Sequence, residues 1–480
     1  MFLHRKEHHS LLIGVGVGVG VGMSLEFTRR CLWAKVRALA SSRTLNGAKG
    51  AATQQNGNGA ITESTIRLMT RLAIQHGAVN LSQGFPNEPP PPEMARAAAS
   101  ALLAGASPKN AAEIAEQLET LTDSGLLGKG KETRDLLSQY SFPFGLPLLR
   151  QELQRYYARY YPGLAADAEQ NLTVVLGATE GFACVLRTVC KPGDRVVFFE
   201  PFHELYPSQC KLWHLSPCAV TLREQTATGE WAFDLAELEA ALDGARALLL
   251  NTPHNPTGKV FTAAELEDIA KLCLKHKVVC VTDDIYEHIV FDNTPRVPPH
   301  MALQAGMAEQ VFVVNSISKT ARATGWRVGW VVSPAKYTTP LRGVHDQLVL
   351  QAATPLQYGA VFMLQMTDDF FAEHGIEYAA KRDVLLPALR SVGFKISFVP
   401  KGAYYIFADY TGVPTLAGLS PTEAAMKMTR DVGVACVPGD NFYLGESRTA
   451  PDLGGRYLRF AFVRSMDLLE EAAVRMKERM

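Results

Sequence analysis

The stretch NSISKTARATGWRVGW over residues 315–330 says most about the fold of this chain. It follows the apolar run VFVV over residues 311–314, a pattern that predicts a buried strand ending at a turn of small, hydroxyl-bearing residues. Lys319 lies in that turn. A lone lysine in a loop is ordinarily a solvated surface charge, but here small neighbours leave room for a bulky group on its amine. A lysine in such a place can form a Schiff base with a carbonyl cofactor, and Ser316 and Arg327 could hold the phosphate of that cofactor.

Two further polar motifs follow predicted strands. The sequence NTPHNPTGK over residues 251–259 comes after the apolar run ALLL, and VVCVTDDIY over residues 278–286 reads as a buried strand with carboxylates at its end. In open α/β sheets, ligands bind beyond the carboxyl ends of the strands. The three motifs are therefore expected to converge on one crevice.

Together with other segments, these motifs resemble the class I/II aminotransferases that use pyridoxal 5′-phosphate, in particular the kynurenine, glutamine and methionine transaminases. The similarity runs from about residue 61 to the C-terminus. It implies an α/β protein of the aspartate-aminotransferase-like fold (fold type I), with a mostly parallel sheet in a large domain and a smaller α/β domain. The segments that carry it are residues 80–86, 139–145, 251–259, 278–286, 315–330 and 457–462.

The resemblance also implies a division of the chain. Residues 61–95 are expected to form an N-terminal arm that contributes to the small domain. Residues 96–350 are assigned to the large cofactor-binding domain, and residues 351–480 to the small C-terminal domain. A polar segment at residues 106–137 has no counterpart in the family and is interpreted as an inserted surface loop or an artefact of the gene model.

Residues 1–60 differ in composition from the rest of the chain. Residues 15–22 alternate glycine and valine, which makes them too glycine-rich and too short to span a bilayer. From Met23 onward the segment is basic, with Glu26 as its only acid before Arg43, as in an organelle transit peptide. We therefore expect targeting to the mitochondrion, with cytoplasm or plastid as alternatives. A disordered tail, or a true start at Met23, is the other interpretation.

The overall composition excludes some partners. The 480 residues carry a formal net charge of +0, which gives no electrostatic reason to expect binding to nucleic acid or to acidic membranes. Eight cysteines are scattered without a CxxC pair, as in proteins of a reducing compartment.

By resemblance, the cofactor ring has five neighbours. Lys319 is the catalytic residue that binds it covalently, and Asp283 holds a proton on the pyridine nitrogen, because a nearby carboxylate raises the pKa of that nitrogen. Tyr286 and Asn255 donate to the ring oxygen. Asn255–Pro256 is a candidate cis peptide bond, although a turn alone would also explain Asn-Pro. His203 stands where the family usually stacks an aromatic ring, and a neutral imidazole is expected there.

By resemblance, the phosphate of the cofactor is expected at a strand-to-helix turn. Ala178 and Thr179 follow Gly177, and a helix N-terminus with close backbone N–H groups favours an anion. An ordinary βα turn is the alternative. Ser316 and Arg327 would complete the cradle, and Tyr140 resembles the phenol that reaches the phosphate from a neighbouring subunit. That contact implies a homodimer with shared active sites.

By resemblance, Arg459 is expected to bind the substrate's carboxylate. This arginine lies in an alternating run near the C-terminus, and its planar fork matches a carboxylate with two parallel hydrogen bonds. By resemblance, Gly84 adds a backbone contact and Asn255 a side-chain contact. The alternative for Arg459 is a structural salt bridge to an internal acid.

The resemblance implies transfer of an amino group from a large neutral amino acid, such as kynurenine, glutamine, methionine or an aromatic residue, to a 2-oxo acid. A cysteine-S-conjugate β-lyase would need the same residues and is the first alternative. A transcription regulator on the same fold would need a DNA-binding module before residue 61. The basic N-terminal segment lacks the apolar helical periodicity of such a module.

Overall fold

The computed structural model describes residues 65–82, 84, 91, 93–94, 96–97, 142–225, 228–292, 294–295 and 300–480. All of them fall within one compact unit, Thr62–Met480. The predicted targeting segment, the predicted inserted loop and Tyr140 lie outside the described residues.

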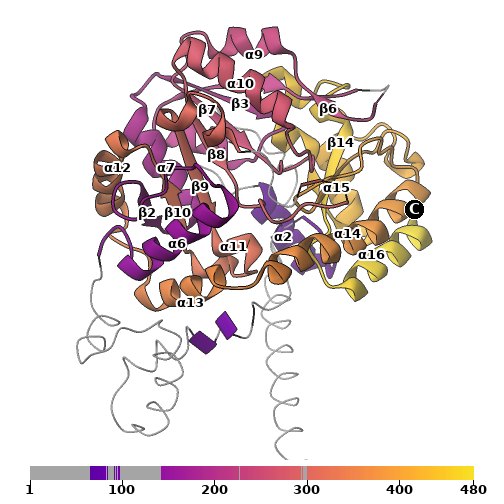
Figure 1. Cartoon of the computed structure of the whole chain (residues 1–480). Coiled ribbons are helices and arrows are strands. Elements are labelled where there is room, and N and C mark those ends of the chain that lie inside the picture. Colours follow the sequence, from indigo (N-terminus) through magenta and orange to yellow (C-terminus); the bar gives the residue numbers. More distant parts are fainter. Residues whose placement is uncertain are drawn as a thin grey trace, which may run out of the picture. The chain divides into compact units, whose positions relative to one another are not determined.

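A seven-stranded sheet forms the centre of the larger domain (Figure 1). Its neighbouring strands pair in parallel, except that β10 runs antiparallel to both of its neighbours. Every residue of β7, β8 and β9 is buried. Such unbroken apolar runs are expected where helices cover both faces of a sheet. In sheet order, the strands are β2 (Leu172–Val175), β10 (Gly329–Val332), β9 (Val311–Ser316), β8 (Val279–Asp283), β7 (Ala247–Asn251), β3 (Arg195–Glu200) and β4 (Ser216–Thr221).

Two layers of helices cover this sheet, each with its own hydrophobic core. One core joins the strands to α6 (Pro147–Tyr160), α9 (Leu235–Leu242), α10 (Ala263–His276) and α13 (Thr354–Leu364). The other joins them to α7 (Gly177–Val189), α8 (Leu205–Leu212) and α12 (Ala335–Leu348). Figure 1 shows α9 and α10 together at the top of the view and α7 and α12 at its left. The contacts of α13 place this helix with the large sheet, although it follows residue 350.

Local sequence signals fix where these helices begin. Thr262 caps α10, accepting a hydrogen bond from the backbone of Glu265 while the Glu265 side chain bonds back to the Thr262 backbone. This reciprocal pair satisfies two N–H groups that have no partner inside the helix. Asp234 caps α9 in the same region by accepting from the backbone of Ala236 and Glu237.

The smaller domain is built on a three-stranded antiparallel sheet in the order β11 (Tyr405–Asp409), β14 (Tyr457–Ala461), β13 (Val437–Pro438). Its core includes side chains from α14 (Asp368–Ser391), α15 (Pro421–Lys427) and α16 (Met466–Arg479). In Figure 1 these helices lie beside β14. The N-terminal part of the described chain joins this domain, because β1 (Val79–Asn80) pairs in parallel with β12 (Val434–Ala435) and α2 (Thr65–His76) packs nearby.

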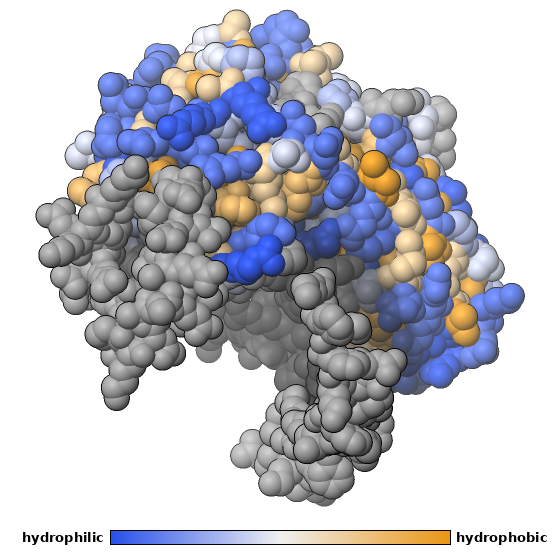
Figure 2. Space-filling model, turned by 60° about the horizontal axis from the view of Figure 1, so that its bottom comes forward, coloured by the Kyte–Doolittle hydropathy of each residue, from blue (hydrophilic) through white to orange (hydrophobic). Residues whose placement is uncertain are grey.

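The surface mixes polar and apolar residues. On the face in Figure 2, tan and orange residues gather in the middle, next to hydrophilic ones. Phe142 and Leu348 are large apolar side chains that are 54% and 43% exposed. Among the described residues, no helix is both long enough and apolar enough to cross a membrane.

Candidate active site

The parallel register brings the three polar motifs together. Asn251 at the end of β7 lies opposite Asp283 at the end of β8, and Asp283 lies opposite Val314 of β9, two residues before Ser316. Because the carboxyl ends of these strands share one edge of the sheet, the residues that follow them gather beyond that edge.

Lys319 lies in the short helix α11 (Ile317–Thr320) directly after β9. Its Nζ donates a hydrogen bond of 2.9 Å to the backbone oxygen of Gly84. Burial, with the nearby Arg327 guanidinium, lowers the pKa of the Lys319 amine to about 8. A lysine with a lowered pKa is neutral, and therefore nucleophilic, in a larger fraction of molecules at neutral pH.

Asp283 presents a carboxylate with one free oxygen. Its Oδ2 accepts a hydrogen bond of 2.8 Å from the Tyr206 hydroxyl, while its Oδ1 is buried and has no hydrogen-bond partner among the described residues. Burial raises the pKa of Asp283 to about 7. An unpartnered buried oxygen is costly, which fits a site where a ligand brings its own donor, such as a protonated ring nitrogen.

Arg459 on β14 is almost completely buried and projects into the same region. Its Nη1 donates to Asn255 Oδ1 at 2.9 Å, its Nη2 donates to the backbone oxygen of Ser82 at 2.8 Å, and its Nε has no partner in the described part of the chain. The rings of Tyr405 and Phe442 lie 4.4 Å and 4.9 Å from the guanidinium carbon. The ion pairs of the described residues do not include Arg459, so its charge remains available for an anionic ligand.

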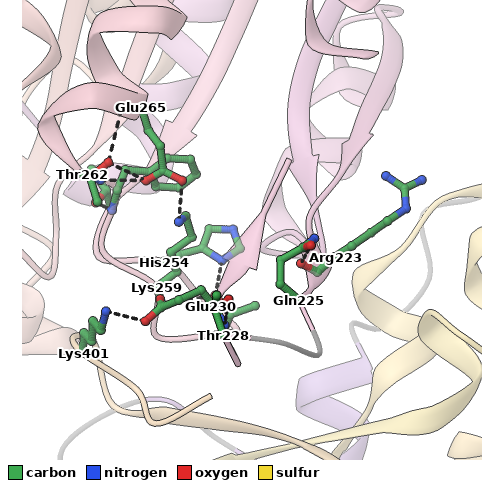
Figure 3. Close-up of polar contacts among 12 residues, drawn as sticks. Arg223, Gln225, Thr228, Glu230, His254, Lys259, Thr262, Glu265 and Lys401 are labelled. Atoms are coloured by element: carbon green, nitrogen blue, oxygen red, sulfur yellow. Dashed lines mark hydrogen bonds and ion pairs between the residues drawn. The ribbon is translucent and has the colours of Figure 1, made fainter. Parts of the chain in front are cut away.

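The loop that carries Asn255 is held by its own polar contacts. The peptide bond before Pro256 is cis, as the sequence suggested, and so are those before Pro201 and Pro253. Figure 3 shows His254, Lys259 and Glu265 in this region, with Lys259 Nζ 2.7 Å from Glu265 Oε1. His254 Nδ1 lies 2.8 Å from the Thr257 hydroxyl, and burial lowers the pKa of His254 to about 3. These contacts tie the loop to the N-terminus of α10 and fix the position of Asn255.

The expected phosphate cradle also comes together. Gly177 has φ +76°, and a Cβ at this position would lie 2.3 Å from Arg327 Nη2, so Arg327 packs directly on the first residue of α7. Ser316 pairs in register with Gly329, whose own ideal Cβ would lie 2.9 Å from the backbone nitrogen of Ala178. Thr179, the next residue, is exposed. The N-terminus of α7 and the Arg327 guanidinium therefore lie side by side, a combination that suits a phosphate.

Tyr286 and His203 complete the site as far as the structure describes it. The Tyr286 hydroxyl lies 3.0 Å from the Tyr405 hydroxyl, and burial raises the pKa of Tyr286 well above its usual value. His203 Nδ1 accepts a hydrogen bond of 3.1 Å from the backbone of Leu205, so Nε2 carries the proton in the neutral ring. Burial and the charges of Arg459 and Lys319 lower the pKa of His203 to about 3, which keeps the imidazole neutral.

The sequence did not single out Tyr206, Tyr405 or Glu287. Glu287 is buried behind the site, where it accepts from Tyr156, Tyr161 and Asn315 at 2.5, 2.7 and 2.5 Å, and burial raises its pKa to about 7. Its position directly after Asp283-Asp284-Ile285-Tyr286 was the one available signal. Tyr206 and Tyr405 lie on elements far from Asp283 in sequence, so only the fold reveals their contacts.

The residues around Lys319 fit pyridoxal 5′-phosphate. The Lys319 amine, with its lowered pKa, matches the aldehyde of this cofactor. The unpartnered, buried Oδ1 of Asp283 matches its ring nitrogen, and the N-terminus of α7 beside Arg327 matches its phosphate. None of these cofactor groups is matched to Arg459, which therefore suits a second anion, such as a substrate carboxylate.

Comparison with known proteins agrees with the geometry. The solved structure of an N-succinyldiaminopimelate aminotransferase from Mycobacterium tuberculosis superposes with a TM-score of 0.75 at 30% identity, covering 87% of this chain and 98% of that one. A methionine aminotransferase of Escherichia coli, YbdL, gives a TM-score of 0.72 at 26% identity, with 87% and 100% covered. Kynurenine–oxoglutarate transaminase 3 of Mus musculus is 29% identical over 423 residues, 84% of this chain and 85% of the relative.

The sequence pattern of the family described as "Aminotransferase class I and II" matches residues 78–476, which span both domains and every described residue of the site. The similarity to the mouse transaminase and the aspartate-aminotransferase-like fold agree with the expectations from the sequence. This chain belongs to the class I and II aminotransferases.

Proposed function

We propose that the chain is a pyridoxal 5′-phosphate-dependent transaminase that transfers the amino group of a large neutral amino acid to a 2-oxo acid. The observation that carries this proposal is the pairing of Lys319, whose pKa is lowered to about 8, with the buried, unpartnered Oδ1 of Asp283 in one site. When bound, the cofactor supplies an aldehyde for amines and a pyridine ring that accepts electrons.

The described residues divide the work of such a reaction. Arg459 binds the α-carboxylate of the amino acid through its fork, and Asn255 holds that fork in place. With its free oxygen, Asp283 would hold a proton on the ring nitrogen of a bound cofactor, and Tyr286 would donate to the ring oxygen. Lys319 takes the proton from the Cα of the substrate with Nζ, because an amine of pKa about 8 is a good general base near neutral pH.

The preferred donor is proposed from the relatives. The names of these relatives include kynurenine and methionine, both large neutral amino acids, as well as N-succinyldiaminopimelate. The neutral imidazole of His203 adds no positive charge for a second carboxylate among the described residues of the site. A panel of kynurenine, glutamine, methionine, phenylalanine, N-succinyldiaminopimelate and aspartate, compared by kcat/KM, tests this proposal, and a preference for aspartate would contradict it.

The test of the chemistry is Lys319→Ala, with Lys336→Ala as its control, since Lys336 is a surface residue that pairs with Glu309. Lys319→Ala is expected to abolish both the visible absorbance of the bound cofactor and amino transfer, whereas Lys336→Ala keeps both. Full turnover in Lys319→Ala would contradict the proposed role. Release of pyruvate and ammonia from a cysteine S-conjugate without a 2-oxo acid would reveal the alternative β-lyase reaction.

We further propose a homodimer, in which Tyr140 of one subunit reaches the phosphate site of the other. The exposed Phe142 lies two residues from Tyr140 and would be covered in such an assembly. The family supports this arrangement, and analytical ultracentrifugation of the holoenzyme, which measures the mass of the assembly, tests it.

The basic composition of residues 1–60 supports the proposal of a mitochondrial location, which a fluorescent fusion of that segment tests.

A further inference from the structure

Tyr405 touches three separate parts of the site. Its hydroxyl lies 3.0 Å from the Tyr286 hydroxyl. Its ring lies 4.4 Å from the guanidinium carbon of Arg459. A Cβ at Gly84 would lie 2.0 Å from the Tyr405 hydroxyl oxygen, so the backbone of Gly84 runs directly against this phenol.

The fold explains why one side chain reaches all three. Tyr405 begins β11, which pairs with β14 so that Phe407 lies opposite Arg459. Because side chains alternate along a strand, Tyr405 and Phe407 point to the same face, the one that Arg459 occupies. Tyr405 is 2% exposed, so its hydroxyl is held by protein groups and not by bulk water.

We propose that Tyr405 is a positioning residue that links the carboxylate clamp to the group that donates to the cofactor's ring oxygen. The inference rests on the proposed function. Its hydroxyl acts through Tyr286, and its ring acts through Arg459. The small domain would thereby influence the cofactor as well as the substrate.

Either hydroxyl can donate in the contact between the two phenols, and a bound cofactor would decide which one does. Tyr286 has one hydroxyl hydrogen, and donation to the ring oxygen of a bound cofactor would use it. The hydrogen between the phenols is then that of Tyr405, which donates to Tyr286. A phenol that accepts a hydrogen bond becomes a stronger donor, an effect of roughly 10–30% per bond.

Loss of this hydroxyl has a spectroscopic consequence. Hydrogen-bond donors at the ring oxygen withdraw electron density from the ring. They also withdraw it from the Lys319 nitrogen that would be joined to the cofactor's aldehyde carbon, so that this nitrogen, and not the ring nitrogen, would lose its proton at lower pH. Tyr405→Phe weakens the Tyr286 donor and is therefore expected to raise the pH midpoint of the cofactor's visible absorbance, by about 0.3 unit. The phenylalanine ring still covers Arg459, so the KM for the amino acid changes less than about twofold.

Loss of the ring has a different consequence. Tyr405→Leu removes the cation–π contact with Arg459, and the KM for the amino acid is expected to rise roughly 2- to 30-fold. A side chain that served only to pack the domain would not separate the two readouts in this way.

The experiment is a spectrophotometric pH titration of the holoenzyme together with steady-state kinetics, for wild type, Tyr405→Phe and Tyr405→Leu. Tyr443→Phe is the matched control, because Tyr443 is buried in the same domain and its hydroxyl has no hydrogen-bond partner among the described residues. The control is expected to leave both midpoint and KM unchanged.

A double-mutant cycle with Tyr286→Phe sharpens the test. If Tyr405 acts through Tyr286, Tyr405→Phe adds no further shift of the midpoint in the Tyr286→Phe background. Equal shifts in both backgrounds, or no shift in either, would overturn the inference. A wild-type chain with no visible absorbance after incubation with cofactor would instead overturn the proposed function, so the two failures are distinguishable.

Discussion

Arg459 on β14 of the small domain donates a hydrogen bond of 2.9 Å to Asn255, which lies in the loop after β7 of the large domain. The same guanidinium donates to Ser82, in the N-terminal part of the described chain. One buried cation thus joins three regions that are distant in sequence. A carboxylate that binds Arg459 would draw on all three.

Replacement of Arg459 tests this clamp. Arg459→Gln is expected to raise the KM for the amino acid by roughly 30- to 5000-fold, because loss of one partner of a buried, hydrogen-bonded charge pair costs about 2–5 kcal/mol. Arg459→Lys keeps the charge but loses the fork, and is expected to fall between Gln and wild type. Steady-state kinetics check this order, and a lysine variant equal to wild type would argue against two-point binding.

Asp283 is expected to matter for rate more than for binding of the substrate. Asp283→Asn keeps the shape but removes the negative charge, and the half-reaction with an amino acid is expected to slow by about 100-fold or more. Rapid-mixing spectroscopy measures that rate, which is expressed per bound cofactor. Asp284→Asn is the comparison, since Asp284 bonds to His300 and Thr282 instead of facing the site, and it should keep most of the rate.

The stability of the cofactor-free protein should depend on pH through two buried acids. Burial raises the pKa of Asp283 and of Glu287 to about 7, above the usual range of unfolded carboxyl groups near 4. Between about pH 4 and 7 the folded state therefore binds more protons than the unfolded state, and stability falls as pH rises, by up to about 1.4 kcal/mol per unit for each proton. Above about pH 7 this contribution is flat.

Urea unfolding between pH 5 and 8 checks whether the free energy of unfolding falls as the pH rises. Asp283→Asn and Glu287→Gln should each flatten the decline, whereas Asp369→Asn, at an exposed position, should not. A wild-type protein that gains stability across this range relative to Asp283→Asn would contradict the assignment of a raised pKa to Asp283.

The sequence was sufficient to predict the strand ends. Asn255, Asp283 and Lys319 each follow an apolar run, and the register of β7, β8 and β9 follows from those runs meeting in one parallel sheet. The antiparallel direction of β10 and the packing of α13 on the large sheet were not predictable, because both depend on contacts between distant segments.

The partners of the site residues were harder to predict than the residues themselves. Tyr206 contacts Asp283 across 77 positions of sequence, and Tyr405 contacts Tyr286 across 119. Aromatic residues at strand ends and in helices usually pack in cores, so nothing local distinguishes these two. Their roles follow only from the three-dimensional arrangement of α8, β8 and β11.

The core of the large domain offers a test of the fold that is independent of the cofactor. Leu249 lies in β7 at 1% exposure, between the two helix layers, and Leu249→Ala is expected to cost about 2–5 kcal/mol of unfolding free energy because it leaves a cavity. Leu235 is 46% exposed at the start of α9, so Leu235→Ala is expected to change stability by less than about 0.5 kcal/mol. Urea unfolding of the two variants measures the difference. Equal effects would mean that β7 is not the buried centre of the sheet.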